Sequence, residues 1–368
     1  MNSDLILVLV VATALAFDFT NGFHDTANVA ATSISTRALA PRRAVVLAAI
    51  LNFAGAFISL EVAATVAQGL VNSGAITTTT VFAGLIGAIT WNLATWYFGL
   101  PSSSSHALIG GVVGAAFFAQ GADAVNGQGV LDKVLIPALV SPTLAFVAAG
   151  LCVFTAYRIV GRERPGHVRR GFRVGQLLSG GLLAISHGTN DGQKTMGVIA
   201  LALVAHGDIS PAHFHIPTWV VVSAATAIGL GTYAGGWRII NTVGNRIHKM
   251  DVAQGFAAQG AGAAVILAAS HFGFPLSTTH TTSGAVIGAG AAKRLSAVRW
   301  GVAGNIVAAW VLTLPAAACV GGLVYGFTRL FGGGALGPLV VAVVAVALIA
   351  ILFARRAQVA RAAPVTQT

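Results

Sequence analysis

Two short polar motifs each occur twice in this chain of 368 residues. The sequence GFHD at residues 22–25 recurs as GTND at 188–191, and PSSSSH at 101–106 recurs as PLSTTH at 275–280. The repeats are offset by 166 and 174 residues and keep the same order, so the chain consists of two related halves. In a very apolar chain, a duplicated set of polar residues indicates a solute pathway between two pseudo-symmetric halves.

The composition places the chain in a membrane. Hydrophobic residues make up 56% of it and charged residues only 8%, whereas a soluble domain carries roughly 25% charged residues. The 45 glycines fit this class, because small residues let membrane helices approach each other closely. Cys152 and Cys319 lie in apolar runs without metal-ligand spacing, and we interpret them as packing residues.

The net charge of +11 raises the question of a polyanionic partner such as nucleic acid. The distribution of the cations argues against that partner, because they lie between the apolar runs, as cytoplasmic loops do under the positive-inside rule. They form groups at residues 37–43, 158–173, 238–249, 293–299 and 355–361. We therefore expect a multi-pass protein of the cell membrane (the plasma or inner membrane), with lipid and not nucleic acid as its surroundings.

Several apolar runs approach or exceed the ~20 residues that a transmembrane helix needs. The runs near the motifs are shorter: residues 5–17 lead into the polar segment 18–25, and residues 177–185 lead into 186–191. We expect broken helices or re-entrant hairpins there. The fold prediction is an all-α, polytopic membrane protein with about ten to twelve transmembrane or re-entrant elements. The spanning runs lie near residues 44–70, 80–100, 134–157, 217–237, 252–272, 300–330 and 335–353.

The basic residues also predict how the halves are related. After the first motif, residues 37–43 contain three arginines, whereas residues 195–237 of the second half contain no Lys or Arg. After the second motif the asymmetry reverses, since residues 107–132 lack cations and residues 293–299 contain three. Corresponding loops then lie on opposite sides of the membrane, which predicts an inverted-topology repeat suited to alternating access. Lys133 is one cation that fits this pattern poorly.

The predicted domains are an N-terminal transmembrane repeat at 1–157, a basic cytoplasmic linker at 158–173, a C-terminal transmembrane repeat at 174–354 and a cytoplasmic tail at 355–368. The sequence RERPG at 162–166 is typical of a loop and marks the linker. The sequence leaves open whether the protein forms a homodimer.

The residues around the motifs resemble the inorganic phosphate transporter (PiT) family, especially its bacterial low-affinity branch. The resemblance rests on NGFHDTAN at 21–28, SHGTNDGQK at 186–194, WN at 91–92 and the two Pro-x-Ser-Ser/Thr-Ser/Thr-His boxes, and it covers nearly the whole chain. It implies a helical carrier that moves phosphate with a cation, either a proton with a metal–phosphate complex or sodium. It also implies that the duplicated motifs line the substrate site.

Stripping the hydration shell from phosphate requires many directed donors rather than one strong charge. The two hydroxyl boxes, at 103–105 and 277–279, follow prolines and precede Gly-rich apolar runs, where the N-terminus of a helix would offer unpaired N–H groups. The alternative is that these hydroxyls bond to their own helix turn. The residues predicted to bind phosphate are Ser103, Ser104, Ser105, Ser277, Thr278, Thr279 and Lys194.

Asp25 and Asp191 are predicted to hold the coupling cation. An ionisable side chain at membrane depth is costly and is therefore a functional candidate, and carboxylates beside an anion site would repel phosphate without a cation between them. Oxygen ligands suit a hard cation, so a proton, sodium or a divalent metal is expected, without a resident cofactor. A capped, buried Asp is the alternative. The predicted cation ligands are Asp18, Asp25, Asn28, Asn190 and Asp191.

His24 beside Asp25 is a candidate metal ligand or proton relay, although a membrane histidine also commonly serves as an interhelical donor. Lys194 stands where the first half has Asn28, and its ammonium could pair with Asp191 or meet phosphate directly. Sodium-coupled relatives tend to have Glu at the positions equivalent to Asn52 and Gln259 and an apolar residue at that of Asp18, which favours the proton or metal–phosphate branch. Further possible site residues are Asn21, Asn52, Asn92, His106, Gln259 and His280.

Three functions compete. The first is a secondary active transporter that imports phosphate, the second a carrier for another oxyanion such as sulfate, and the third a membrane-embedded Ser/His/Asp hydrolase. A catalytic triad needs one nucleophile oriented by one base, whereas these hydroxyls come in duplicated runs, and the sequence contains neither GxSxG nor HExxH. We therefore predict a transporter and not an enzyme.

Overall fold

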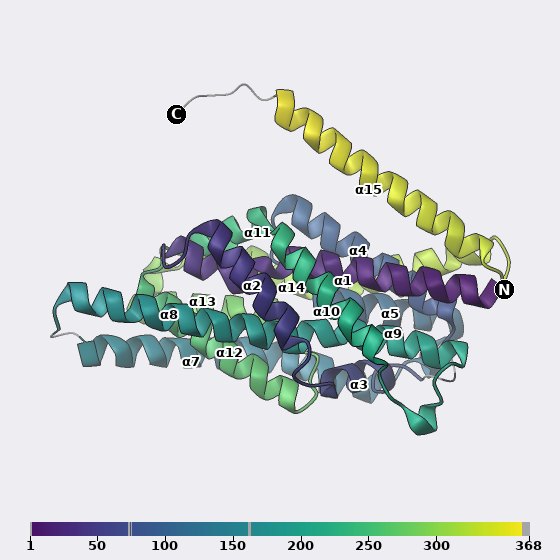
Figure 1. Ribbon diagram of the computed structural model, residues 1–368, viewed down its shortest axis with the longest axis horizontal. Coiled ribbons are helices and arrows are strands. Elements are labelled where there is room, and N and C mark those ends of the chain that lie inside the picture. Colours follow the sequence, from purple (N-terminus) through teal and green to yellow (C-terminus); the bar gives the residue numbers. More distant parts are fainter. Residues whose placement is uncertain (1, 73, 75, 161–162, 363–368) are drawn as a thin grey trace.

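The computed structural model describes residues 2–72, 74, 76–160 and 163–362, and within these ranges it is helical without a β-strand (Figure 1). The all-α prediction is confirmed. The first half contains α1 (Asn2–Ser35), α2 (Pro41–Gly55), α3 (Glu61–Gln68), α4 (Thr78–Phe98), α5 (Ser104–Gln120), α6 (Gly127–Val130) and α7 (Ile136–Val160). The second half contains α8 (Pro165–His187), α9 (Gln193–His206), α10 (Thr218–Ala234), α11 (Trp237–Asn241), α12 (Val252–His271), α13 (Thr278–Lys293), α14 (Trp300–Arg329) and α15 (Leu336–Ala362).

Five helical segments of the described chain are long and apolar enough to cross a membrane, and a sixth results if the bent pair at 218–234 and 237–246 is one span. Large apolar side chains such as Leu139, Leu151 and Leu178 are exposed on their outer faces. Lipid would cover such faces, because a transmembrane helix needs no polar surface toward hydrocarbon. The prediction of a polytopic membrane protein is thus confirmed.

The segments around the first motif differ from the prediction of broken helices. α1 is one continuous helix, because its polar residues Asp18, Asn21, Asp25 and Asn28 are spaced by three or four and share one helix face, so the backbone bonds are kept. In the second half, α8 and α9 are joined by a π-helical turn at Gly188–Gly192. Such a widened turn is common at functional sites and does not break the helix.

Other predicted boundaries also differ. The run 44–70 forms two helices, α2 and α3, because the amides of Ala56 and Ile58 bond back to Asn52 and Gly55 and close the first helix. The predicted linker at 158–173 holds the end of α7 and the first turns of α8, so it is shorter than expected. α15 extends into the predicted tail as far as Ala362, and residues 363–368 lie outside the described residues.

The two motif-bearing helices run side by side in opposite directions. Near one end of α1, Arg173 of α8 donates a hydrogen bond of 3.2 Å to the carbonyl of Ala38. Near the other end, His206 of α9 lies 3.3 Å from the Asp4 carboxylate. Figure 1 shows α1 running from the right toward the left and α8 followed by α9 running back. This arrangement brings the middle of α1 against the π turn.

Two helix pairs pack in a matched way across the halves. α5 packs against α14 and α13 packs against α7, so each hydroxyl-box helix is covered by a long helix of the opposite half. A Cβ at Gly114 would lie 2.2 Å from the carbonyl oxygen of Ala318, and one at Gly288 would lie 2.1 Å from that of Phe146. Only glycine permits this approach of the backbones, as in other small-residue membrane interfaces.

Two buried apolar clusters flank the polar motifs. Along α1, Phe17 belongs to the first cluster and Ala27 to the second, and the polar residues lie between them. A separate groove of about 910 Å³ lies between α15 and the helices α1, α4 and α14. Its lining is almost wholly apolar, with residues such as Leu9, Leu323 and Val341, so it is not the site of a charged solute.

Candidate functional site

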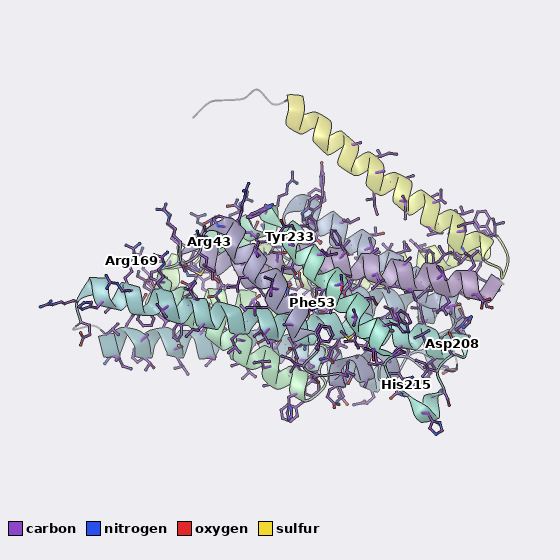
Figure 2. The ribbon with its side chains drawn as sticks, viewed as in Figure 1. Arg43, Phe53, Arg169, Asp208, His215 and Tyr233 are labelled. Carbon is purple, nitrogen blue, oxygen red and sulfur yellow. The ribbon has the colours of Figure 1, made fainter. Side chains whose placement is uncertain are left out.

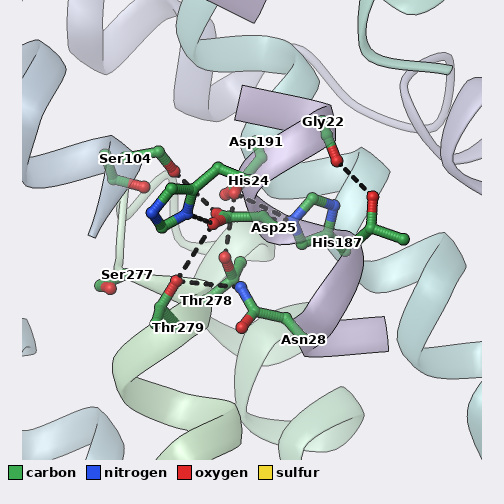
Figure 3. A network of polar contacts seen from close by, with 12 residues as sticks. Gly22, His24, Asp25, Asn28, Ser104, His187, Asp191, Ser277, Thr278 and Thr279 are labelled. Atoms are coloured by element: carbon green, nitrogen blue, oxygen red, sulfur yellow. Dashed lines mark hydrogen bonds and ion pairs between the residues drawn. The ribbon is translucent and has the colours of Figure 1, made fainter. Parts of the chain in front are cut away.

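The two motif carboxylates meet at the centre of the bundle (Figure 3). Asp25 lies in the middle of α1 and Asp191 in the π turn, and both are buried. One ligand atom from each of Asp25, His187 and Asp191 lies within 4.8 Å of the others, so these three residues could hold a cation. The structure therefore brings together the two acidic residues that the sequence identified from their duplication.

Close helix packing at the motif glycines makes this meeting possible. A Cβ at Gly22 would lie 2.3 Å from the carbonyl oxygen of Ile228 in α10, and one at Gly188 would lie 2.1 Å from that of Asn52 in α2. A larger residue would push these helices apart. The glycine shared by GFHD and GTND therefore has a packing role that is the same in both halves.

The hydroxyl boxes begin α5 and α13 and contact the carboxylates of their own halves. Ser104 donates a hydrogen bond of 2.7 Å to Oδ2 of Asp25. Thr278 donates one of 2.9 Å to Oδ2 of Asp191. These are equivalent positions of the two boxes, so the same carboxylate–hydroxyl pair is built twice.

The first hydroxyl of each box caps its helix. The side-chain oxygen of Ser103 accepts from the backbone N–H of His106 at 3.0 Å, and that of Ser277 accepts from His280 at 3.1 Å. Both are ordinary N-caps. For Ser103 and Ser277 the structure therefore shows a hydrogen bond within their own helix, which was the alternative to substrate binding. The O–H groups of these two residues are not used in the capping bonds.

The third hydroxyl of each box contacts the opposite half. Asn28 donates a hydrogen bond of 2.9 Å to Thr279, and Lys194 donates one of 2.5 Å to Ser105. Thr279 also lies 3.4 Å from Oδ1 of Asp25. The site is therefore shared by both halves, and neither half completes it alone.

Lys194 is buried and makes three short contacts. Its ammonium donates to Oδ1 of Asp191 at 2.5 Å, to Ser105 at 2.5 Å and to the carbonyl of Leu276 at 2.7 Å. An ammonium has three N–H donors, so all of them are used. Of the two roles considered for Lys194, the structure shows the pairing with Asp191.

His187 was missed as a site residue by the sequence reasoning. Its Nε2 lies 3.2 Å from Asp191 and 3.8 Å from Asp25, and its Nδ1 lies 3.1 Å from Oδ1 of Asn52. Asn52 donates through Nδ2 to Thr232, so its oxygen faces the ring and Nδ1 carries the hydrogen. The available signal was its spacing, because a residue four positions before Asp191 lies on the same helix face.

The geometry at His187 calls for a positive charge. With a hydrogen on Nδ1, a neutral ring would point the lone pair of Nε2 at two carboxylates. That arrangement is repulsive unless the ring is an imidazolium, a carboxyl group is protonated or a cation lies between the groups. Each of these three possibilities places positive charge or a proton beside Asp25 and Asp191.

His24 supports Asp25 from the other side. Its Nδ1 lies 2.7 Å from Oδ1 of Asp25, and its Nε2 lies 3.3 Å from the hydroxyl of Thr95. Nδ1 is therefore engaged by the carboxylate. The three-residue group of Asp25, His187 and Asp191 is a more complete metal-ligand set than the predicted pair of His24 and Asp25.

Two predicted residues point away from the carboxylates. Asn190 donates to the hydroxyl of Ser270 at 2.9 Å and to the carbonyl of Phe274 at 3.0 Å, and so fixes the π turn to the end of α12. Both hydrogens of its amide are thus used by Ser270 and Phe274 rather than near the carboxylates. Gln259 donates to Ser33 at 2.9 Å and joins α12 to α1.

Three further candidates, Asp18, Asn21 and Asn92, are buried. Asp18 lies seven residues, or two turns, before Asp25 on the same face of α1, with Asn21 and Thr195 as polar neighbours. Asn92 is buried within α4. These side chains extend the polar interior along α1 beyond the two motif carboxylates.

His106 and His280 contact each other across the halves. Their ring centroids are 4.6 Å apart with the rings nearly perpendicular, and His280 also stacks on Trp310 at 4.2 Å. The pair joins the first turns of α5 and α13. This ring packing between helices differs from the interhelical hydrogen bond that was the alternative to substrate contact.

Comparison with known proteins identifies the family. The profile of the phosphate transporter family matches residues 21–167 and 160–321 of this chain. A protein of Mycobacterium tuberculosis described as "Probable low-affinity inorganic phosphate transporter" is 52% identical over 334 residues, which cover 90% of this chain and 80% of that protein. A Bacillus subtilis protein with the same description is 43% identical over 324 residues, covering 87% and 96%.

A solved structure shows the same fold. The structure described as the sodium-dependent phosphate transporter superposes with a TM-score of 0.78 at 26% identity, over 88% of this chain and 99% of that one. The relatives are transporters and not enzymes, which excludes the hydrolase alternative. The relatives and the spanning helices also confirm a multi-pass protein of the cell membrane. Over most of its length, this chain belongs to the phosphate transporter family.

Proposed function

We propose that this protein imports inorganic phosphate by cation-coupled symport through alternating access. The observation that carries the proposal is the duplicated carboxylate–hydroxyl pair, Ser104 with Asp25 and Thr278 with Asp191, at two converging helix N-termini. Each half contributes one pair to a buried site that both halves complete.

The helix N-termini supply the donors for the anion. The first N–H groups of α5 and α13 have no acceptor within their helices, and a helix N-terminus favours negative charge. Ser104, Ser105, Thr278 and Thr279 add rotatable hydroxyls at the same turns. A tetrahedral phosphate between the two turns would receive donors from both halves.

The carboxylates make the cation obligatory. Asp25 and Asp191 are buried beside these donors, and Lys194 pairs only with Asp191. The remaining charge of Asp25 in a low-dielectric interior would repel a phosphate anion strongly. Phosphate would therefore enter only when a cation neutralises a carboxylate. This requirement couples the flux of phosphate to the flux of the cation without any additional gate.

Neutral amides at two positions favour a proton or a metal–phosphate complex as the coupling species. At the positions of Asn52 and Gln259, sodium-coupled relatives tend to have Glu. Here Asn52 contacts His187, and Gln259 joins α12 to α1. The buried Asp18 adds a carboxyl group where those relatives have an apolar residue. The similar solved structure is a sodium-dependent transporter, so sodium is the alternative to be tested.

The arrangement of the halves suits alternating access. α1 and α8–α9 are antiparallel and meet at the carboxylates, and α5 and α13 are each packed on the opposite half. Rocking of one half against the other would open the same central site to either side of the membrane, as inverted repeats do in other carriers.

The test is uptake of labelled phosphate into proteoliposomes of purified protein. We expect accumulation under an imposed pH gradient, with or without Mg²⁺, and little response to a sodium gradient. Accumulation driven only by sodium would contradict the proposed coupling species. Uptake that no cation gradient drives above equilibrium would contradict symport itself.

Competition separates phosphate from the second candidate substrate. Arsenate has the charge and the protonation states of phosphate, whereas sulfate has no proton to donate at neutral pH. We expect unlabelled arsenate to compete strongly and sulfate weakly. Equal competition by sulfate would favour the general oxyanion carrier.

A further inference from the structure

We propose that the ammonium of Lys194 permanently replaces one coupling cation, so that only the Asp25 side of the site binds a movable one. This inference rests on the proposed symport and specifies its stoichiometry. It follows from comparing the two halves at a single pair of equivalent positions.

Asn28 and Lys194 occupy the same place in their halves. Each lies three residues after the motif aspartate on the same helix, and each reaches the third hydroxyl of the opposite box. Asn28 contacts Thr279 at 2.9 Å, and Lys194 contacts Ser105 at 2.5 Å. The positions therefore correspond in space as well as in sequence, and they differ by one positive charge.

The contacts of Lys194 are those of a bound cation. Three oxygens surround its nitrogen, from the Asp191 carboxylate, the Ser105 hydroxyl and the Leu276 carbonyl, at 2.5 to 2.7 Å. A carboxylate, a hydroxyl and a carbonyl are the ligands that a hard metal cation takes. All three N–H groups are used, so phosphate could bind the ammonium only by displacing one of these oxygens.

The Asp25 side lacks such a charge on its own half. Asp25 accepts from Ser104 at 2.7 Å and from Thr279 at 3.4 Å, and Asn28 is neutral. The rings nearby are His24 at 2.7 Å and His187 at 3.8 Å. Neither ring carries a permanent charge as Lys194 does, so a movable cation must supply the positive charge beside Asp25, whereas Asp191 already has one attached to the chain.

The stoichiometry of Lys194→Asn tests this inference. The variant copies the first half at this position and should create a second movable site. At a clamped membrane potential, the slope of the logarithm of the phosphate accumulation ratio at zero net flux against the logarithm of the cation gradient gives the number of cations per phosphate. We expect that number to rise by one relative to the wild type, and the cation dependence of uptake to become steeper.

Lys293→Asn is the matched control, because Lys293 also faces a carboxylate, Asp251 at 3.6 Å, but is half exposed at a helix end. It should leave the stoichiometry unchanged. An unchanged number for Lys194→Asn would overturn the inference. If this variant instead showed a weaker apparent phosphate affinity at wild-type stoichiometry, Lys194 would be a phosphate ligand and the inference would also fail.

Thermal melting covers the case in which Lys194→Asn does not transport. Ligand binding to the folded state raises its stability in proportion to RT ln(1 + [L]/Kd). We expect Na⁺, Mg²⁺ or low pH, each tested separately on purified protein, to stabilise Lys194→Asn more than the wild type or Lys293→Asn. Equal stabilisation would contradict the inference. Because this measurement needs no transport, it separates the inference from the proposed symport.

Discussion

Ser104 at the start of α5 donates a hydrogen bond of 2.7 Å to Asp25 in the middle of α1. The bond joins the two motifs of the first half, and Thr278 and Asp191 repeat it in the second half. A hydroxyl that donates to a carboxylate keeps its oxygen lone pairs but has spent its hydrogen. In the proposed transport cycle, each hydroxyl turns from the carboxylate to phosphate when the anion binds, and neutralising the carboxylate would release the hydroxyl.

Asp25→Asn and Asp191→Asn should each abolish concentrative uptake. Asn keeps an oxygen to accept from Ser104 or Thr278 but removes the charge that holds the movable cation at Asp25 or the Lys194 ammonium at Asp191. Breaking a buried charge pair costs about 3 kcal/mol. In the binding of the cation, this cost corresponds to an affinity on the order of 100-fold weaker. Proteoliposome uptake measures the effect, with size-exclusion chromatography to establish folding. Asp208→Asn, at an exposed loop, is the control. Near-normal accumulation in either variant would refute the cation assignment.

Ser104→Ala and Thr278→Ala should each raise the apparent substrate constant for phosphate about 10-fold, because a hydrogen bond to a charged group contributes roughly 1.5 to 3 kcal/mol. Thr282→Ala is the control on α13, since the Thr282 hydroxyl bonds to the carbonyl of Thr278 one turn earlier. Concentration-dependent uptake provides the constants. Unchanged affinity in both box variants would place the anion elsewhere.

Gly114→Leu and Gly288→Leu should destabilise the protein, because a side chain would collide with the backbone of the facing helix at Ala318 or Phe146. Overpacking costs about 1 to 3 kcal/mol, and melting in detergent should show a lower Tm. Gly304→Leu in α14 has open space around its Cβ and should melt like the wild type. Equal Tm values for all three variants would contradict the matched packing of α5 and α13.

Arg42→Cys and Thr218→Cys should react with an impermeant thiol reagent from opposite faces of the membrane. These residues begin α2 and α10, the equivalent helices after the first motif in each half. Figure 2 shows Arg43 and Arg169 toward one end of the molecule and Asp208 and His215 toward the other. Labelling is done in a background without Cys152 and Cys319. Reaction of both sites from the same face would overturn the inverted repeat.

The sequence was sufficient to predict that the two motif aspartates and the two hydroxyl boxes meet. Asp25 and Asp191 are equivalent residues of the two halves, and so are the residues of the two hydroxyl boxes. Related halves that share a site must bring such equivalent residues together at their interface. The length of the apolar runs was sufficient to predict five of the helices, whose bounds lie close to the predicted windows. These helices are α4, α7, α10, α12 and α14. These features depend on composition and repetition, which the sequence displays directly.

Other features depend on helix geometry that polarity alone does not show. The polar residues of α1 suggested a break, but their spacing places them on one face of an intact helix. The π turn at Gly188–Gly192 begins directly after His187, which lies beside Asp191, and Asn190 within this turn contacts Ser270. The three-acceptor environment of Lys194 requires the opposite half and could not be read from its own motif.

The most direct test of the central claim is a crystal structure with bound arsenate, whose arsenic atom is located by anomalous scattering. We predict one peak between the first turns of α5 and α13, within hydrogen-bond reach of Ser104 and Thr278. A peak outside this region, or one in contact with only one of the two boxes, would contradict a phosphate site shared by both halves.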